Sequence, residues 1–270
     1  MTGILCLQYN PKIGDKDFNL RKVEEFIEEN SDKKLDLVLL PEFFSTGIDH
    51  YSFLNFPENE QGGKTILKIK ELAKKFQTNI VAGSVIEKSK DKLYNTSFVI
   101  NRQGFVVAKY RKIHLFNYNG GTEGQRITEG IEPVAVKLDF GIVGLNICYD
   151  FRYPLMQKNL AKAGAEILVC PTAWCISNDK YNNPESLEHE QNIWESLNKI
   201  RAYDNLVYVA SCNQIGKANE KVSNIGFSMI ISPEGEILAN AKNKEYAIFA
   251  QIDLKKVRQY KQEYPIAKID

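Results

Sequence analysis

The sequence of 270 residues lacks an excess of charge of either sign, with 35 Lys and Arg against 34 Asp and Glu. Such a balance creates no field that would attract a nucleic acid or an anionic membrane. No apolar run approaches the roughly 20 residues that cross a bilayer, and the first residues lack the regions of a secretory signal. We therefore expect no nucleic acid or membrane partner and a cytoplasmic location, where the sequon at Asn95 is accidental.

Metal-ligand patterns and cofactor motifs are also missing. The five cysteines include no C-x-x-C pair, and their odd number favours reduced thiols over disulfides. Only three histidines occur, without metal-ligand spacing: His114, which we expect to pack or to orient its own loop, and His50 and His189, which we expect at the surface. The chain has no P-loop, G-x-G-x-x-G or G-x-S-x-G motif. We expect no metal and no cofactor.

Short apolar segments alternate with segments of helical periodicity, the pattern of a layered α/β fold. Strands are predicted over residues 3–9, 36–40, 141–147, 166–170, 206–212, 225–232, 236–241 and 246–252. Helices are predicted from Asp15 or Asp17, either of which could be the cap, to about residue 30, over 66–76, from about 153, and from Asn183 as a cap. Hairpin turns are predicted at 101–104 and 232–235. We expect Pro41 and Pro171 to end the strands before them. Because no linker divides the chain, we predict one domain over residues 1–270.

Three reactive side chains follow predicted strands. Glu42 comes after LDLVLLP, Lys112 after FVVAKYR and Cys148 after GIVGLNI. In layered α/β folds, sites form where the carboxyl ends of strands meet a loop. A carboxylate can take the proton of a thiol, and an ammonium can stabilise a thiolate or an oxyanion. The grouping indicates a candidate site, although charged residues after strands are commonly solvated and a buried free cysteine commonly acts as a small apolar side chain.

The segments LVLLPEFFSTG, AKYRKIHLF and GLNICYDFRYP together resemble the nitrilase superfamily of carbon–nitrogen hydrolases. The likeness runs over nearly the whole chain, and three motifs in order are far more specific than any one of them. The resemblance implies a four-layer αββα sandwich with two central mixed sheets, and a catalytic triad of Glu42, Lys112 and Cys148. It also implies a second glutamate between the lysine and the cysteine, and Glu123 fits that position better than Glu129.

The resemblance further implies a role for each residue. Glu42 would accept the thiol proton as Cys148 attacks the carbonyl or nitrile carbon, then protonate the departing ammonia and activate the water that hydrolyses the thioester. Lys112 and the backbone N–H of Tyr149 would hold the oxyanion. Glu123 would fix the Lys112 ammonium and the substrate nitrogen. Proton transfer in this scheme needs no histidine.

Residues 148–154, CYDFRYP, resemble the branch of the family that contains ω-amidases and related small amidases. An ω-amide carries a far carboxylate that requires a cation, which Arg152 can supply, although it can equally brace the next helix start. Trp174 can line the pocket or belong to the core. We predict an amidase that acts on a small carboxylate-bearing amide. The alternatives are an N-carbamoyl amine or amino-acid hydrolase, a nitrilase and a non-catalytic scaffold.

Two further features bear on substrate and assembly. The segment 172–183 is longer than in ω-amidases, so the substrate preference can differ from theirs. Members of the family usually dimerise through the helices after the nucleophile, here about 153–164 and 184–203, which implies a homodimer or a higher homo-oligomer. The second helix is predicted to bury an apolar stripe made of Leu187, Ile193, Trp194, Leu197 and Ile200. That stripe can also be covered within one chain.

Overall fold

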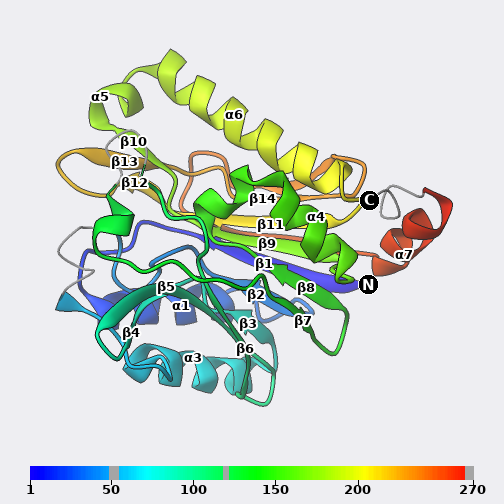
Figure 1. Cartoon of the computed structure of the whole chain (residues 1–270), viewed down its shortest axis with the longest axis horizontal. Helices are drawn as coiled ribbons and strands as arrows, with labels where there is room; N and C mark the ends of the chain where they lie inside the picture. Colours follow the sequence, from blue (N-terminus) through cyan, green and yellow to red (C-terminus); the bar gives the residue numbers. More distant parts are fainter. Residues whose placement is uncertain (49–54, 118–121, 265–270) are drawn as a thin grey trace.

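Two β-sheets lie face to face between helices in the computed structural model, which describes residues 1–48, 55–117 and 122–264 (Figure 1). The first sheet has the order β16-β1-β2-β3-β5-β4, with β6 paired to β5. Its strands are β1 (Thr2–Gln8), β2 (Leu37–Leu39), β3 (Asn79–Val81), β4 (Val85–Ser89), β5 (Lys92–Ile100), β6 (Val106–Arg111) and β16 (Tyr246–Ile252).

The second sheet has the order β15-β14-β11-β9-β8-β7, and a small third sheet has the order β10-β13-β12. The strands of the second sheet are β7 (Ala135–Lys137), β8 (Ile142–Leu145), β9 (Ile167–Thr172), β11 (Tyr208–Asn213), β14 (Met229–Ile231) and β15 (Ile237–Asn240). Those of the third are β10 (Cys175–Ser177), β12 (Ile215–Lys217) and β13 (Val222–Ile225). Both large sheets mix parallel and antiparallel pairs.

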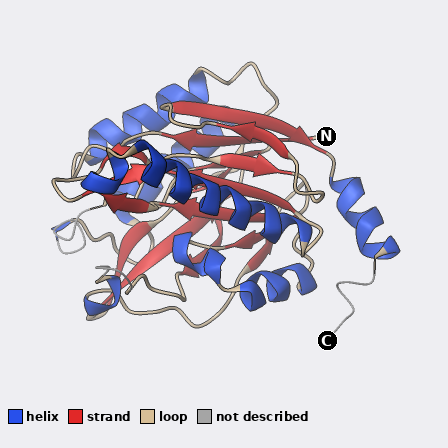
Figure 2. Ribbon diagram, turned by 90° about the horizontal axis from the view of Figure 1, so that it is seen from above, coloured by secondary structure: helices blue, strands red, loops and turns tan. Residues whose placement is uncertain are grey.

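Helices cover the outer faces of the two large sheets (Figures 1 and 2). The first sheet is covered by α1 (Lys16–Glu28) and α3 (Gly63–Phe76), and the second by α4 (Pro154–Lys162) and α6 (Pro184–Tyr203). The remaining helical segments are η1 (Glu123–Gln125), η2 (Cys148–Arg152), α5 (Asn178–Tyr181) and α7 (Leu254–Glu263). The four-layer αββα arrangement predicted from the sequence is confirmed. No helix of the described ranges has the length and apolar composition of a membrane span.

The continuous apolar run of β1 follows from this layering. Ile4 and Cys6 face the second sheet, whereas Leu5 and Leu7 face α1 and α3, so successive side chains enter two different cores. A strand that is covered on both faces needs apolar residues at every position. The strand predicted over residues 3–9 is therefore correct.

Helix starts and turns agree with their predicted chemistry. The Asp15 side chain accepts a hydrogen bond from the backbone N–H of Phe18 and caps α1. Asn183 caps α6 by accepting from the N–H of Ser186. The turns at 101–104 and 232–235 each close with a hydrogen bond from the N–H of their last residue to the first carbonyl, 2.8 and 2.9 Å long.

Two strand predictions are wrong. β9 does not end before Pro171 but continues to Thr172, because β8 has already ended opposite Val169 and the proline therefore breaks no bond to it. The strand predicted over 225–232 is split into β13 and β14. Gly226 and Phe227 have φ values of 71° and 58°, a left-handed conformation that interrupts a β-strand.

The buried stripe predicted for the helix at 184–203 is also wrong in part. Trp194 is buried, but Ile193 and Ile200 are 40% and 54% exposed. The buried face of α6 instead carries polar side chains that find hydrogen-bond partners below the helix. Gln191 donates to the carbonyl of Ile225, and Arg201 donates to the carbonyl of Phe151. Apolar periodicity could not reveal a face that is buried through hydrogen bonds.

Candidate active site

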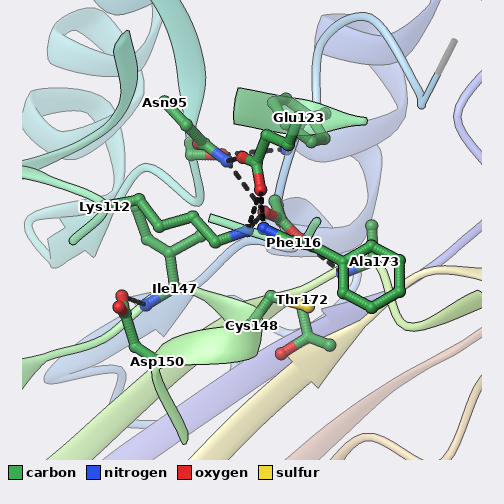
Figure 3. A network of polar contacts seen from close by, with 12 residues as sticks. Asn95, Lys112, Phe116, Glu123, Ile147, Cys148, Asp150, Thr172 and Ala173 are labelled. Atoms are coloured by element: carbon green, nitrogen blue, oxygen red, sulfur yellow. Dashed lines mark hydrogen bonds and ion pairs between the residues drawn. The ribbon is translucent and has the colours of Figure 1, made fainter. Parts of the chain in front are cut away.

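The four residues predicted to be catalytic come from separate parts of the chain and converge in the interior (Figure 3). Glu42 lies just after β2, from which Leu40 and Pro41 separate it, and Lys112 follows β6 directly. Glu123 begins η1, and Cys148 begins η2 after β8. The exposed fraction is 2% for Glu42 and Lys112 and 6% for Glu123. None of these charged groups is therefore a solvated loop residue. The rival Glu129 is exposed.

One ammonium lies between two carboxylates. The Nζ atom of Lys112 is 2.9 Å from Oε1 of Glu42 and 2.9 Å from Oε2 of Glu123. Each carboxylate also accepts a hydrogen bond from a backbone N–H group. Ala173 donates to Glu42 Oε2 at 2.9 Å, and Phe116 donates to Glu123 Oε2 at 2.8 Å. Charge-assisted bonds of this kind are short and strong, and they hold the three side chains in one geometry.

Burial and charge set the protonation states of the site. Burial raises the pKa of Glu42, and Lys112 offsets only part of that rise. Burial alone would lower the pKa of Lys112, but the two glutamates outweigh it, so this pKa lies well above its ordinary value. Burial also raises the pKa of Cys148, as does the charge of Glu42, while Lys112 opposes both. Cys148 is therefore a thiol at neutral pH, and it needs a base such as Glu42 to become a nucleophile.

The backbone at Cys148 is strained. Its φ of 47° lies in the left-handed region, which a residue with a Cβ adopts only when its surroundings hold it there. The carboxylate of Asp150 accepts from the N–H of Ile147 at 3.0 Å, and Gln157 donates to the Asp150 carbonyl and to Asn146. These bonds hold the tight turn that presents the Cys148 side chain beside the charged cluster (Figure 3).

Asp150 also ties the turn of the nucleophile to the segment that carries the lysine. Its carboxylate accepts from the hydroxyl of Tyr110 at 2.6 Å and from the backbone N–H of His114 at 2.9 Å. The ring Nδ1 of His114 is also 2.9 Å from this carboxylate, and the ring stacks on Tyr153 with centroids 3.5 Å apart. His114 thus packs and holds its loop, as the sequence predicts.

The three predicted substrate-binding residues lie together. The guanidinium carbon of Arg152 is 5.7 Å from the ring centroid of Tyr149 and 5.9 Å from that of Trp174. Arg152 is exposed, and it forms no ion pair with a carboxylate in the described part of the chain. Trp174 also packs against the buried Trp194, with centroids 5.2 Å apart. Trp174 therefore belongs to the edge of the core and to the surroundings of Arg152 at the same time.

Two residues of the network are not among the predicted site residues, although Asp150 stands in the segment CYDFRYP. Asn95, in the middle of β5, is fully buried and donates to both glutamates. Its burial also excludes glycosylation at its sequon. Asp150 is fully buried as well. Local patterns do not show that these two side chains would hold the site together, because their hydrogen-bond partners are distant in the sequence.

Other potential sites receive no support. His189 is exposed, and His50 lies outside the described residues. Within the described ranges, no three or more His, Cys, Asp or Glu side chains are grouped so that they could hold a metal. All five cysteines are free.

Comparison with known proteins places this geometry in a family. The carbon-nitrogen hydrolase family matches residues 5–262. The chain is 33% identical to the 2-oxoglutaramate amidase of Bacillus subtilis, over 97% of this chain and 95% of that protein. It is 32% identical to the human omega-amidase NIT2, over 93% and 88% of the two chains.

A solved structure agrees with these sequence relatives. Saccharomyces cerevisiae Nit3, a member of branch 10 of the nitrilase superfamily, superimposes with a TM-score of 0.84 at 27% identity, over 98% of this chain and 94% of that one. The family match covers every predicted catalytic residue, and the fold is the one that the resemblance implies. The chain therefore belongs to the carbon–nitrogen hydrolase family, within the nitrilase superfamily.

Proposed function

We propose that the protein is an amidase that hydrolyses the terminal amide of a small carboxylate-bearing molecule through a thioester on Cys148. The observation that carries this proposal is the buried cluster of Glu42, Lys112 and Glu123 beside a cysteine in a strained turn. Burying three charged groups is costly. A scaffold has no physical need for the arrangement, whereas a hydrolase uses each member of it.

The chemistry begins with Glu42, which takes the thiol proton as Sγ of Cys148 attacks the amide carbon. Lys112 and the backbone N–H of Tyr149 stabilise the negative oxygen that forms. The carbon–nitrogen bond then breaks, and protonated Glu42 gives its proton to the departing ammonia. Glu42 next takes a proton from water, whose oxygen attacks the thioester carbon. The carbon–sulfur bond breaks, protonated Glu42 returns its proton to Sγ of Cys148, and a carboxylic acid leaves.

Arg152 supports a substrate with a second, anionic end. It is a cation without a carboxylate partner in the described chain, and it lies between the rings of Tyr149 and Trp174. A short amide whose far end is a carboxylate satisfies both the cation and the reacting centre. The relatives named as 2-oxoglutaramate amidase and omega-amidase agree with this choice.

An ammonia-release assay tests the proposal. The panel contains succinamate, 2-oxoglutaramate, carbamoyl amines, carbamoyl amino acids and simple nitriles. We expect the first two to be hydrolysed fastest and the folded Cys148→Ala variant to be inactive. Faster release from the carbamoyl compounds, together with carbon dioxide, would identify an N-carbamoyl hydrolase instead. Retained activity in Cys148→Ala would refute the thioester mechanism.

We also propose a homodimer that forms through α4 and α6 and acts in the cytoplasm. Large apolar side chains on these helices and at their ends are exposed in the single chain: Tyr153, Leu155, Ile193, Ile200 and Tyr203. Several large apolar side chains exposed on two helices support an interface there. Five free thiols suit a reducing compartment. Sedimentation at micromolar concentration should give the mass of two chains, and the mass of one chain would contradict the dimer.

A further inference from the structure

The buried site holds two carboxylates and one ammonium, so one negative charge has no counter-charge and needs hydrogen-bond donors. Glu42 and Glu123 both lie against the single ammonium of Lys112, and all three groups are almost fully buried. Two carboxylates in a medium of low dielectric constant repel each other strongly. The ammonium offsets one negative charge, so the second must be stabilised by neutral hydrogen-bond donors.

Asn95 is the one side chain that bridges the two carboxylates besides Lys112 in the described structure (Figure 3). Its Nδ2 atom is 2.8 Å from Oε1 of Glu42 and 2.9 Å from Oε1 of Glu123. One amide hydrogen is available for each. The backbone carbonyl of Asn95 also accepts a hydrogen bond from the backbone N–H of Lys112, 2.8 Å long. One residue thus contacts all three members of the charged cluster.

The position of Asn95 makes these contacts rigid. β5 pairs with β4 on one side and with β6 on the other, and Asn95 lies opposite Ile86 of β4. Strand pairing on both sides leaves the backbone little freedom. The side chain is fully buried, so no water competes for its hydrogens. The donor is consequently fixed before any substrate binds, which is the condition for efficient electrostatic stabilisation.

The orientation of the amide shows which contacts determine it. Its Oδ1 atom is buried and has no hydrogen-bond partner in the described structure. A buried carbonyl without a partner is costly. Rotating the amide by half a turn would place this acceptor against both carboxylates and would lose both bonds. The two glutamates therefore set the orientation of the Asn95 side-chain amide, and its Oδ1 atom is left without a hydrogen bond.

We propose that Asn95 is a positioning residue of the reaction, which holds Glu42 and Glu123 on either side of the Lys112 ammonium and directs Glu42 as a base toward Cys148. This inference rests on the proposed function. A neutral amide suits the task, because it stabilises both carboxylates without adding a charge. A second lysine or arginine would hold Glu42 in its ionised form so firmly that it could not carry a proton between the thiol, the ammonia and the water.

The titration of Glu42 should therefore depend on Asn95. Burial raises the pKa of Glu42, Lys112 lowers it, Glu123 raises it, and the hydrogen bond from Asn95 lowers it. The thiols of Cys148, Cys170 and Cys175 also lie within electrostatic reach of Glu42. Losing this hydrogen bond to the ionised carboxylate should raise the pKa of Glu42 further.

Asn95→Leu and Asn95→Asp test the inference, because both keep the shape of the side chain. The first removes both donors, and the second also adds a third carboxyl group beside Glu42 and Glu123. The matched control is Asn198→Leu, since Asn198 is equally buried, donates its Nδ2 to the Trp194 carbonyl and also has an unpartnered Oδ1. The readout is the pH dependence of Cys148 alkylation by iodoacetamide, measured by mass spectrometry. It needs no amide substrate. Thermal unfolding verifies that each variant is folded.

We expect the acid limb of the alkylation profile to move up by about one pH unit in Asn95→Leu and to stay in place in the control. It should move further in Asn95→Asp, because the added carboxyl group also disfavours ionisation of Glu42. On the best amide, kcat/KM should fall about tenfold to hundredfold with the same displacement of its acid limb. Profiles that superimpose on the wild type would overturn the inference, as would lost activity without a displacement. If one Asn95 variant does not fold, the other decides. If alkylation shifts but the wild type hydrolyses no amide, the control of Glu42 by Asn95 stands and the proposed function fails.

Discussion

Replacing Lys112 by methionine tests whether charge holds the buried cluster together. Methionine has a similar length and an apolar stem, but it leaves Glu42 and Glu123 without the ammonium that lies 2.9 Å from each. Removing one partner of a buried ion pair costs about 3–5 kcal/mol. That is a large share of the roughly 5–15 kcal/mol by which a native protein is stable. We expect a loss of this size at about pH 8.

The loss should shrink in acid, because a proton can replace the missing ammonium. Burial and the second carboxylate already act to raise the pKa of Glu42, and nothing of comparable strength opposes them in the variant. Stabilisation by a group whose pKa is raised on folding is complete below the unfolded value and is lost as the pH rises through the folded value. One proton bound only in the folded state is worth about 1.4 kcal/mol per pH unit. The variant should therefore be less destabilised, relative to the wild type, near pH 5 than near pH 8, by at most about 4 kcal/mol over the three pH units.

Urea unfolding followed by tryptophan fluorescence at both pH values measures this difference. Lys64→Met is the control, since Lys64 is 75% exposed and pairs with Asp17 on the surface at 2.8 Å. Its stability should match that of the wild type at both pH values. Equal destabilisation of Lys112→Met at the two pH values, or no destabilisation near pH 8, would refute the argument that the two carboxylates are buried charges held by the lysine.

Three further predictions concern other parts of the molecule. Asp150→Asn should lower kcat/KM about 10- to 100-fold in the ammonia-release assay, because an amide cannot accept from all the donors around it and the turn at the nucleophile shifts; unchanged activity would show that Asp150 is dispensable. Arg152→Leu should raise KM about tenfold for a carboxylate-bearing amide and leave a neutral amide of equal length unaffected, and an equal effect on both would remove Arg152 from the substrate site. The third concerns Glu87, for which hydrogen bonds from Arg111 and Lys109 outweigh burial and lower the pKa. Its contribution to stability is present above the unfolded value and is lost as the pH falls through the folded one. Glu87→Gln should therefore be less stable than the wild type at neutral pH and should lose less stability on acidification, which circular dichroism during an acid titration can measure.

Much of the fold follows from local patterns. The apolar run at β2 predicts a strand covered on both faces, and capping residues such as Asn183 predict helix starts. These features depend on neighbours within a few positions of the chain, so one sequence contains the information. The errors occur where the outcome depends on distant partners. Pro171 is tolerated in β9 because β8 ends early, and the buried face of α6 is polar because it hydrogen-bonds to other segments.

The same distinction between local patterns and distant partners applies to the site. Glu42, Lys112 and Cys148 could be named from the sequence, because each stands in a motif directly after an apolar strand. Their mutual distances, the strained backbone of Cys148 and the positions of Asn95 and Asp150 come from folding alone. Asn95 is 53 positions from Glu42 and 28 from Glu123 along the chain. Hydrogen bonds act over a few ångströms of space, and residue order does not specify which of many buried polar groups will meet at that range.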